Sequence, residues 1–128
     1  MLESIEGQEV RKRIGPMFHN RPPLDLNKAL RITMDACRGL VAAHKYRVFH
    51  SDIKPDNIMV RKSNGVSVLI DFGISAAMRT TAKANFGGTL PYMSPEALEG
   101  SAGFAADIWS LSVTLYELVP GNLPFPPR

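Results

Sequence analysis

The stretch HSDIKPDNIMVRKSNGVSVLIDFG occupies residues 50–73 and holds the strongest structural signals of the chain. Two runs rich in β-branched residues, 58–61 and 66–70, flank the pair Asn64-Gly65. Such a pair between two β-rich runs is typical of a hairpin turn. The sequence therefore predicts a small β-hairpin at the centre of the chain.

The length of the hairpin loop sets which side chains meet at its open end. With a three-residue loop and Gly65 in the left-handed conformation, Lys62 pairs with Val66 and the ladder places Asn57 opposite Asp71. A two-residue loop would offset the partners by one residue. Either register brings an amide and a carboxylate to the same end of the hairpin.

The segment before the hairpin is dense in ionisable groups and cannot be regular helix, because Pro55 forbids it. Asp52, Lys54, Asn57 and Asp71 together offer carboxylate, amide and ammonium groups, and the oxygen ligands among them suit magnesium. Magnesium with a spare carboxylate and a lysine serves phosphoryl transfer. The alternative is that Asp52 and Asn57 only stabilise a turn by bonding their own backbone.

Two amphipathic or apolar segments flank this central region. Beginning at the N-cap residue Asp25, a helix is predicted to run to about His44. Its expected buried face has a 4-3-4 spacing and consists of Leu30, Met34, Cys37 and Val41. In residues 108–119, eight of twelve residues are apolar or aromatic, which predicts a second helix buried on most sides.

The remaining segments predict loops. Residues 1–23 are interrupted by glycine and proline and are expected to form a loop or a broken helix, in which Arg11-Lys12-Arg13 is a solvated charge run. Residues 74–92 lack any sustained period and predict a long surface loop.

Composition excludes several classes of protein. A chain of 128 residues with 45% hydrophobic and 21% charged residues is typical of one globular domain. The single cysteine excludes an internal disulfide and a cysteine-based metal site. Fifteen basic against twelve acidic residues give a net charge of only +3, so nucleic acid is not an expected partner. No apolar run approaches the ~20 residues of a membrane span, and we expect no membrane partner and a cytoplasmic, intracellular location.

Three motifs stand in order along the chain: residues 50–57, the triplet 71–73, and GTLPYMSPE at 88–96. Together they resemble the large lobe of a eukaryotic-type serine/threonine protein kinase. The resemblance covers about four fifths of the chain, residues 24–125, and includes 107–111, which are similar to the family's buried central helix. It implies an α+β fold, mainly helical, with a small β-hairpin at the active site.

The resemblance implies a role for each residue of the central region. Asp52 would take or orient the proton of the substrate hydroxyl, and Lys54 would contact the transferring phosphate. Asn57 and Asp71 would hold Mg²⁺, and Met59 would form the floor under the adenine of ATP. The implied cofactors are ATP and Mg²⁺, and the implied partner is a protein substrate with Ser or Thr; nothing in the pattern indicates an oligomeric state.

Four further residues resemble structural members of the family. His50 and Phe72 are similar to a stacked hydrophobic column anchored near Asp107. Glu96 resembles a carboxylate that the family pairs with an arginine well beyond the last residue of this sequence, so we expect it to lack its partner here.

The activation segment and the catalytic loop carry features that bear on substrate and regulation. Thr89 would position substrate by bonding near Asp52 and Lys54, and this pattern resembles serine/threonine rather than tyrosine kinases. Ser51 replaces the family's usual arginine, and a serine cannot grip a phosphorylated loop as a planar guanidinium does.

Residues 1–128 hold no glycine-rich phosphate loop and no strand lysine. Residues 24–128 are therefore expected to be a partial kinase domain, from catalytic loop to central helix, with the small lobe and C-terminal helices absent. The isolated chain is then expected to be inactive. One alternative is a non-catalytic, kinase-like binding or regulatory module. A small-molecule phosphotransferase is disfavoured by Thr89 and Pro95-Glu96.

Overall fold

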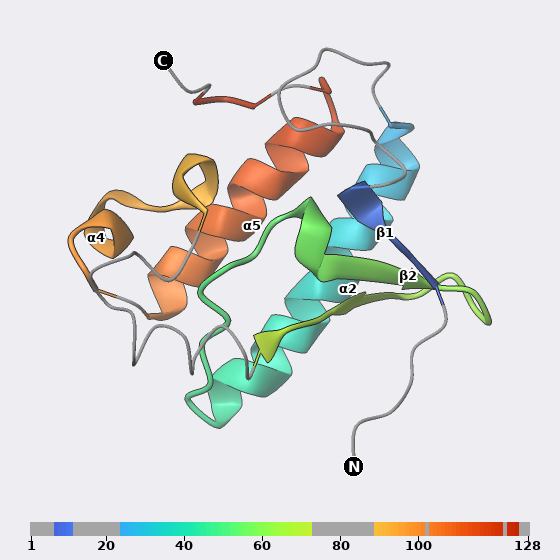
Figure 1. Cartoon of the computed structure of the whole chain (residues 1–128). Helices are drawn as coiled ribbons and strands as arrows, with labels where there is room; N and C mark the ends of the chain where they lie inside the picture. The colour runs from blue at the N-terminus through green and yellow to red at the C-terminus, as the bar shows by residue number, and fades with distance from the viewer. Residues whose placement is uncertain (1–6, 12–23, 73–88, 102, 122, 126–128) are drawn as a thin grey trace.

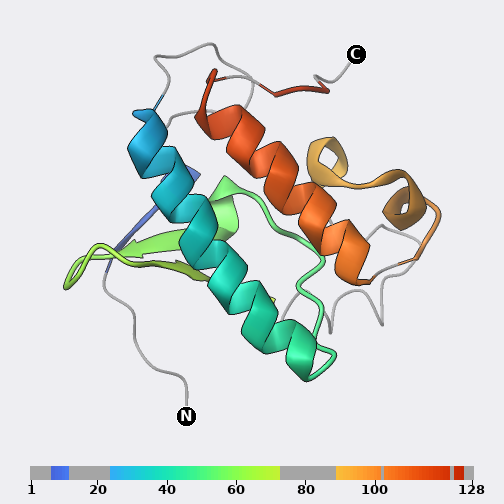
Figure 2. The ribbon, with the colours of Figure 1, turned by 180° about the vertical axis from the view of Figure 1, so that it is seen from behind.

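The computed structural model describes residues 7–11, 24–72, 89–101, 103–121 and 123–125. One long helix lies behind a small sheet, a second long helix packs against the first and lies beside the sheet, and a loop crosses in front of the second helix (Figures 1 and 2). In chain order the elements are β1 (Gly7–Glu9), α2 (Leu26–Lys45), the 3-10 turn η1 (Pro55–Asn57), β2 (Ile58–Arg61), β3 (Ser67–Leu69), the 3-10 turn η3 (Leu90–Tyr92), α4 (Pro95–Leu98) and α5 (Phe104–Leu118). The predicted loop over 74–92 lies outside the described residues up to 88.

The predicted hairpin is present as β2 and β3, but its register differs from both expected ones. Ile58 pairs with Leu69, and the loop between the paired residues Arg61 and Val66 has four residues. The loop is longer because the N–H of Gly65 donates to the Arg61 carbonyl at 2.9 Å, which closes the turn one residue earlier than expected. Gly65 does adopt the left-handed conformation, with φ 74°.

Residues 7–9 form a strand, which the sequence did not predict. β1 pairs antiparallel with β2, with Gly7 opposite Arg61, and completes a three-stranded sheet in the order β1-β2-β3. A side chain at Gly7 would overlap the carbonyl oxygen of Val60, so this close approach requires glycine. Val10, directly after β1, is fully buried in the main core. The interruption by glycine and proline hid this strand.

The limits of helix α2 confirm the prediction, because Asp25 caps it by accepting the N–H of Lys28 at 3.3 Å. The predicted buried face is wrong. The buried residues of α2 are Ala29, Ile32, Ala36 and Leu40. The predicted ones are exposed: Leu30, Met34, Cys37 and Val41. The two faces differ by one residue, or about 100° of rotation, since the small alanines let α2 pack against α5 and β3.

This correction predicts a difference between two leucines of the same helix. Leu40 is 2% exposed, and replacing it by alanine should lower the free energy of unfolding by about 3 kcal/mol through lost burial and a cavity. Leu30 is 42% exposed, and the matched Leu30→Ala change should cost under about 1 kcal/mol. Urea denaturation of the two variants measures both values, and equal losses would contradict the observed face.

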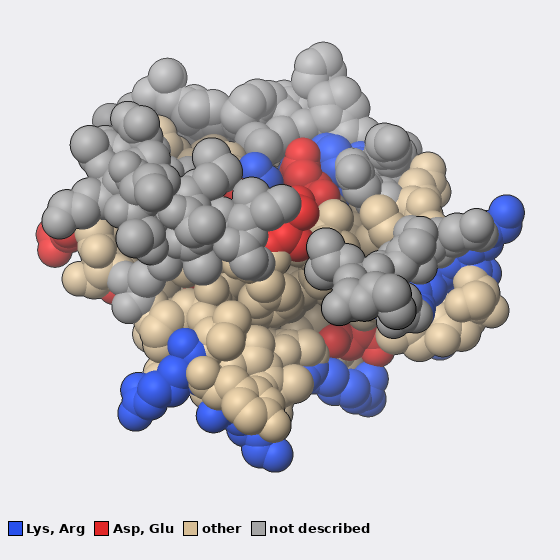
Figure 3. Space-filling model, turned by 60° about the horizontal axis from the view of Figure 1, so that its bottom comes forward, with Lys and Arg blue, Asp and Glu red and all other residues tan. Residues whose placement is uncertain are grey.

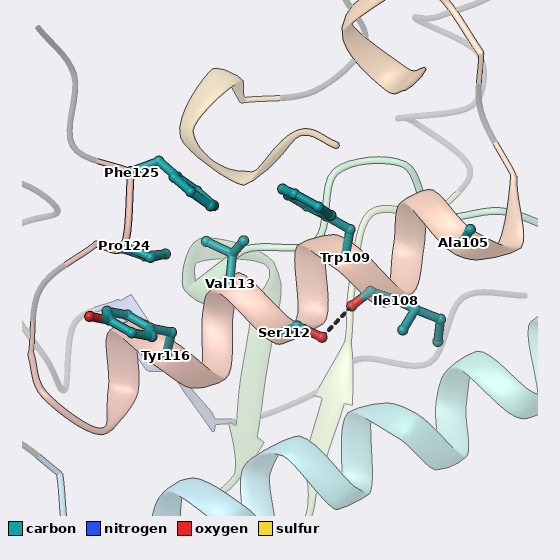
Figure 4. A pocket seen from close by; sticks show the side chains of 8 residues that line it. All are labelled: Ala105, Ile108, Trp109, Ser112, Val113, Tyr116, Pro124 and Phe125. Carbon is teal, nitrogen blue, oxygen red and sulfur yellow. Dashed lines mark hydrogen bonds between the residues drawn. The ribbon is translucent and has the colours of Figure 1, made fainter. Parts of the chain in front are cut away.

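Helix α5 is buried on most sides, as predicted, and the exposed positions within 108–119 form one narrow stripe of Ile108, Ser112 and Tyr116. Its inward face includes four polar residues, Asp107, Ser110, Thr114 and Glu117. On the outward face, Ile108 and Tyr116 are about half exposed, and with Trp109 and Phe125 they line a shallow apolar groove of about 430 Å³ (Figure 4). The sequence did not show that polar groups would take the inner side, where they hold loops of the site. No helix within the described ranges is long and apolar enough to cross a membrane.

Candidate active site

Asp107, in the first turn of α5, holds the start of loop 50–57. Its carboxylate is completely buried and accepts the backbone N–H groups of His50 and Ser51, both at 2.8 Å. The ring Nε2 of His44, at the end of α2, lies 2.9 Å from the same carboxylate. His44 received no role from the sequence, and its partner lies 63 residues away. One carboxylate therefore joins both long helices to the loop.

His50 connects the loop to the end of β3. Its Nε2 donates to the carbonyl of Ile70 at 2.6 Å, which leaves Nδ1 as the acceptor for the N–H of Asp52 at 3.1 Å. Both ring nitrogens are therefore used in the neutral tautomer. The ring also meets Phe72 edge to face, with centroids 4.5 Å apart. These contacts fix the backbone at Asp52.

The carboxylate of Asp52 lies at the centre of a hydrogen-bonded group. Its Oδ1 accepts both the N–H and the hydroxyl of Thr89 at 3.1 Å, and its Oδ2 lies 3.3 Å from the amide nitrogen of Asn57 and 3.5 Å from Nζ of Lys54. Nζ of Lys54 also donates to Oγ1 of Thr89 at 2.5 Å. The structure thus brings four predicted residues together. The side chains of Asp52 and Lys54 are each about one fifth exposed, so a substrate can reach them.

Asn57 and Asp71 lie at neighbouring strand ends. Both amide hydrogens of Asn57 point at Asp52, at its carbonyl (2.8 Å) and its carboxylate, so Oδ1 is the atom left to meet a cation. The carbonyl of Asn57 accepts the N–H of Ile70, and the exposed Asp71 follows at φ 67°. Among the described residues, no hydrogen bond or ion pair joins Asp71 to the Asp52 group.

This donor set fits Mg²⁺ but would not enclose it. The described part of the chain has no cluster of three or more His, Cys, Asp or Glu residues that could hold a metal. An amide oxygen and one carboxylate, completed by phosphate oxygens and water, are ligands that Mg²⁺ accepts. Asn57 and Asp71 could therefore hold the ion only together with a bound nucleotide.

Other predicted residues lie around this group. Met59 is half-buried in the central strand β2. Glu96 is exposed in α4, so its carboxylate is not buried without a partner. Ser51 has φ 73°, and its buried hydroxyl has no hydrogen-bond partner among the described residues.

Arg11 was predicted to be solvated, and the structure contradicts this. Its side chain is 12% exposed and forms ion pairs from Nε to Asp56 at 3.0 Å and from Nη1 to the fully buried Glu117 at 2.8 Å. Its Nη2 donates to the hydroxyl of Tyr92 at 2.6 Å, and that hydroxyl donates to Glu117 at 2.5 Å. Residues 12 and 13 lie outside the described residues. On the face shown in Figure 3, acidic and basic side chains adjoin near the middle.

The pKa values of this network are shifted. Burial raises the pKa of Tyr92 well above its ordinary value near 10, and its hydrogen bond to Glu117 raises it further. Burial lowers the pKa of Arg11, but the hydrogen bond to Glu117 and the nearby Tyr92 and Glu117 more than offset this and raise it. Tyr92 therefore stays protonated and Arg11 charged.

The raised pKa of Tyr92 predicts a dependence of stability on alkaline pH. The neutral phenol is favoured in the folded state, so its contribution is fully present below pH 10 and is lost as pH rises above that value. The free energy of unfolding should then fall by up to about 1.4 kcal/mol per pH unit from this group. Urea denaturation between pH 8 and pH 11 measures the slope, with Tyr92→Phe as the matched control. Parallel curves for the two proteins would contradict the prediction.

The loop with the pattern Asp-x-Lys-x-x-Asn is hydrogen-bonded to the buried helix α5 and leads into the hairpin. Together these elements form a kinase-like arrangement of helices around a small antiparallel sheet. The model of the protein kinase domain matches residues 1–128. The chain therefore belongs to the protein kinase family, whose members generally use ATP and Mg²⁺.

Curated relatives agree with this membership. Serine/threonine-protein kinase PknB of Mycolicibacterium smegmatis is 36% identical over 131 residues, which covers 98% of this chain and 20% of that protein. MAP kinase kinase skh1/pek1 of Schizosaccharomyces pombe is 40% identical over 99 residues, or 77% of this chain and 27% of the relative. A probable serine/threonine-protein kinase of Corynebacterium efficiens, CE0033, is 33% identical over 98% of the chain. The chain spans about a fifth of the length of PknB.

Proposed function

We propose that residues 24–128 are the large-lobe part of a serine/threonine protein kinase domain. In a complete domain, this part transfers the γ-phosphoryl group of ATP to a Ser or Thr hydroxyl of a protein in the cytoplasm. One observation carries the proposal: the Asp52 carboxylate is held by Thr89 and adjoins Lys54 and Asn57, while its exposed side faces solvent. The names of the serine/threonine kinase relatives support it.

Each side chain of this group has a step in the proposed transfer. The substrate hydroxyl donates its hydrogen to the Asp52 carboxylate, which directs the hydroxyl oxygen at the γ-phosphorus. As the new P–O bond forms, the bond to the leaving ADP oxygen breaks, and Asp52 receives the proton. Lys54 places its positive charge beside the transferred phosphoryl group. Asn57 and Asp71 would hold Mg²⁺, which would neutralise phosphate charge.

Thr89 connects substrate choice to this chemistry. Because its hydroxyl bonds both Asp52 and Lys54, the segment that begins at Thr89 lies directly beside the reacting groups. A polypeptide bound along that segment would present its hydroxyl to Asp52. This arrangement supports a protein substrate over a small molecule.

The test is phosphate transfer by a fusion that completes the domain. The parts of the Mycolicibacterium smegmatis kinase domain that flank the matched region are placed before residue 1 and after residue 128. Radiolabelled ATP is supplied with a panel of serine, threonine and tyrosine peptides and with aminoglycosides. We expect labelled serine or threonine peptides and unlabelled tyrosine peptides. Label on the aminoglycosides alone, or on no acceptor, would contradict the proposal.

A further inference from the structure

The segment 7–11 is held against the candidate active site at three points. β1 pairs with β2, where the close approach at Gly7 leaves no room for a side chain. Val10 is fully buried in the main core. Arg11 then enters a polar cluster formed by Asp56, Tyr92 and Glu117. The backbone that leads into Arg11 is thereby fixed in place.

The guanidinium nitrogens of Arg11 contact three different elements. Nε meets Asp56 in η1, Nη2 meets the Tyr92 hydroxyl in η3, and both Nη atoms contact Glu117 in α5, at 2.8 and 3.2 Å. A planar guanidinium presents donors in fixed directions, which an ammonium group cannot do. The cluster therefore matches arginine in shape as well as in charge.

The two loop elements that Arg11 joins are those that carry the site. Asp56 directly precedes Asn57, and Tyr92 follows Thr89 by three residues. Asp52 accepts hydrogen bonds from both Asn57 and Thr89, so the distance between η1 and η3 sets the geometry of its carboxylate. Arg11 spans this distance at the far ends of the two turns, while Lys54 and Thr89 meet at their starts.

Helix α5 supplies a fixed base for both ends of the loop. Asp107 holds the start of loop 50–57, and Glu117 holds its end through Arg11. These two carboxylates are ten residues apart, or about 15 Å along the helix. Ser110, between them, donates to the Tyr92 carbonyl at 2.6 Å. Without Arg11, Asp56 in η1 loses the ion pair that links it to α5, whereas η3 keeps its hydrogen bond from Ser110.

We propose that Arg11 is a positioning residue: its guanidinium sets the spacing between η1 and η3 at which Asn57 and Thr89 can both bond the Asp52 carboxylate. The catalytic consequence rests on the proposed function, but the placement of Asn57 and Thr89 does not. A lysine at position 11 keeps the charge and loses the fork, so it cannot replace the arginine.

The test follows the surroundings of two backbone amides in the 128-residue chain. Backbone amide resonances of Asn57 and Thr89 are compared by NMR in wild type, Arg11→Ala and Arg11→Lys. We expect both amides to shift in both variants, and methylguanidinium to return them toward wild type in Arg11→Ala in a saturable way. Methylammonium at equal ionic strength is the control and should restore nothing. Unshifted amides, or equal effects of the two salts, would overturn the proposal.

Activity in the fusion separates a positioning role from a merely structural one. Arg11→Ala should lower kcat by about 10- to 100-fold with little change in the KM for ATP, and methylguanidinium should recover part of kcat. A wild-type fusion that transfers no phosphate would count against the proposed function alone, because the amide resonances still decide the role of Arg11. If Arg11→Ala does not fold, Asp56→Asn breaks one arm of the fork, and an unmoved Asn57 amide in that variant would overturn the proposal.

Discussion

Replacing Asp107 by alanine is expected to lower the free energy of unfolding by about 3–5 kcal/mol. The change leaves the buried N–H groups of His50 and Ser51 without their acceptor, and each unsatisfied buried donor costs about 1–3 kcal/mol. The contact with His44, which joins α2 to α5, is lost as well. Urea denaturation followed by far-ultraviolet circular dichroism measures the effect.

Two further variants show whether the carboxylate or the side-chain volume matters. Asp107→Asn keeps the volume but turns an amide N–H toward a backbone donor, so we expect a loss close to that of alanine. Glu99→Ala removes an exposed carboxylate after α4 and should change stability by less than about 0.5 kcal/mol. If the free energy of unfolding of Asp107→Ala lay within about 1 kcal/mol of the wild-type value, the contacts of Asp107 would not be what holds loop 50–57 against α5.

Features encoded by neighbouring residues were predicted well. The limits of α2 follow from the Asp25 cap and the helical spacing, and the hairpin follows from Asn64-Gly65 between β-rich runs. The composition of the site also came from short spacings within loop 50–57. The hairpin register was missed because the hydrogen bond from the Gly65 N–H to the Arg61 carbonyl makes the loop one residue longer, and composition does not specify this bond.

The buried face of α2 shows where periodicity alone is insufficient. The more hydrophobic of two adjacent stripes was expected inside, but the stripe with Ala29 and Ala36 is buried. Close packing against α5 and β3 favours small side chains on α2. This requirement is set by α5 and β3, so the spacing of residues within α2 does not show it. A one-residue error in choosing the stripe rotates the whole prediction by about 100°.

Residues that act through distant partners could not be found from the sequence. Arg11 and Glu117 are 106 positions apart, and no pattern in the sequence marks them as a pair. A run of three basic residues is ordinarily solvated, so the charge pattern around Arg11 pointed to the surface. Only the strand β1, itself hidden by neighbouring glycine and proline, brings the arginine to the cluster.

Asp52→Asn should have the largest effect on catalysis, a fall in kcat of about 10²- to 10⁴-fold in the fusion. The amide cannot receive the proton of the substrate hydroxyl. It also places an N–H group among the donors of Thr89, Asn57 and Lys54, which disturbs the local hydrogen bonds. Because Asp52 does not contact the nucleotide in this assignment, the KM for ATP should change little. Steady-state transfer of label from ATP to a serine peptide measures both constants.

Glu99→Gln is the matched control, since it removes one exposed carboxylate outside the site and should leave kcat within twofold of wild type. Asp71→Asn offers a contrast, because a weaker ligand for Mg²⁺ should raise the requirement for the ion as well as lower the rate. Asp52→Asn should leave the magnesium requirement unchanged. A variant that lost rate only at low Mg²⁺ would reassign Asp52 from proton acceptor to metal ligand, and one with wild-type kcat would remove it from the chemistry.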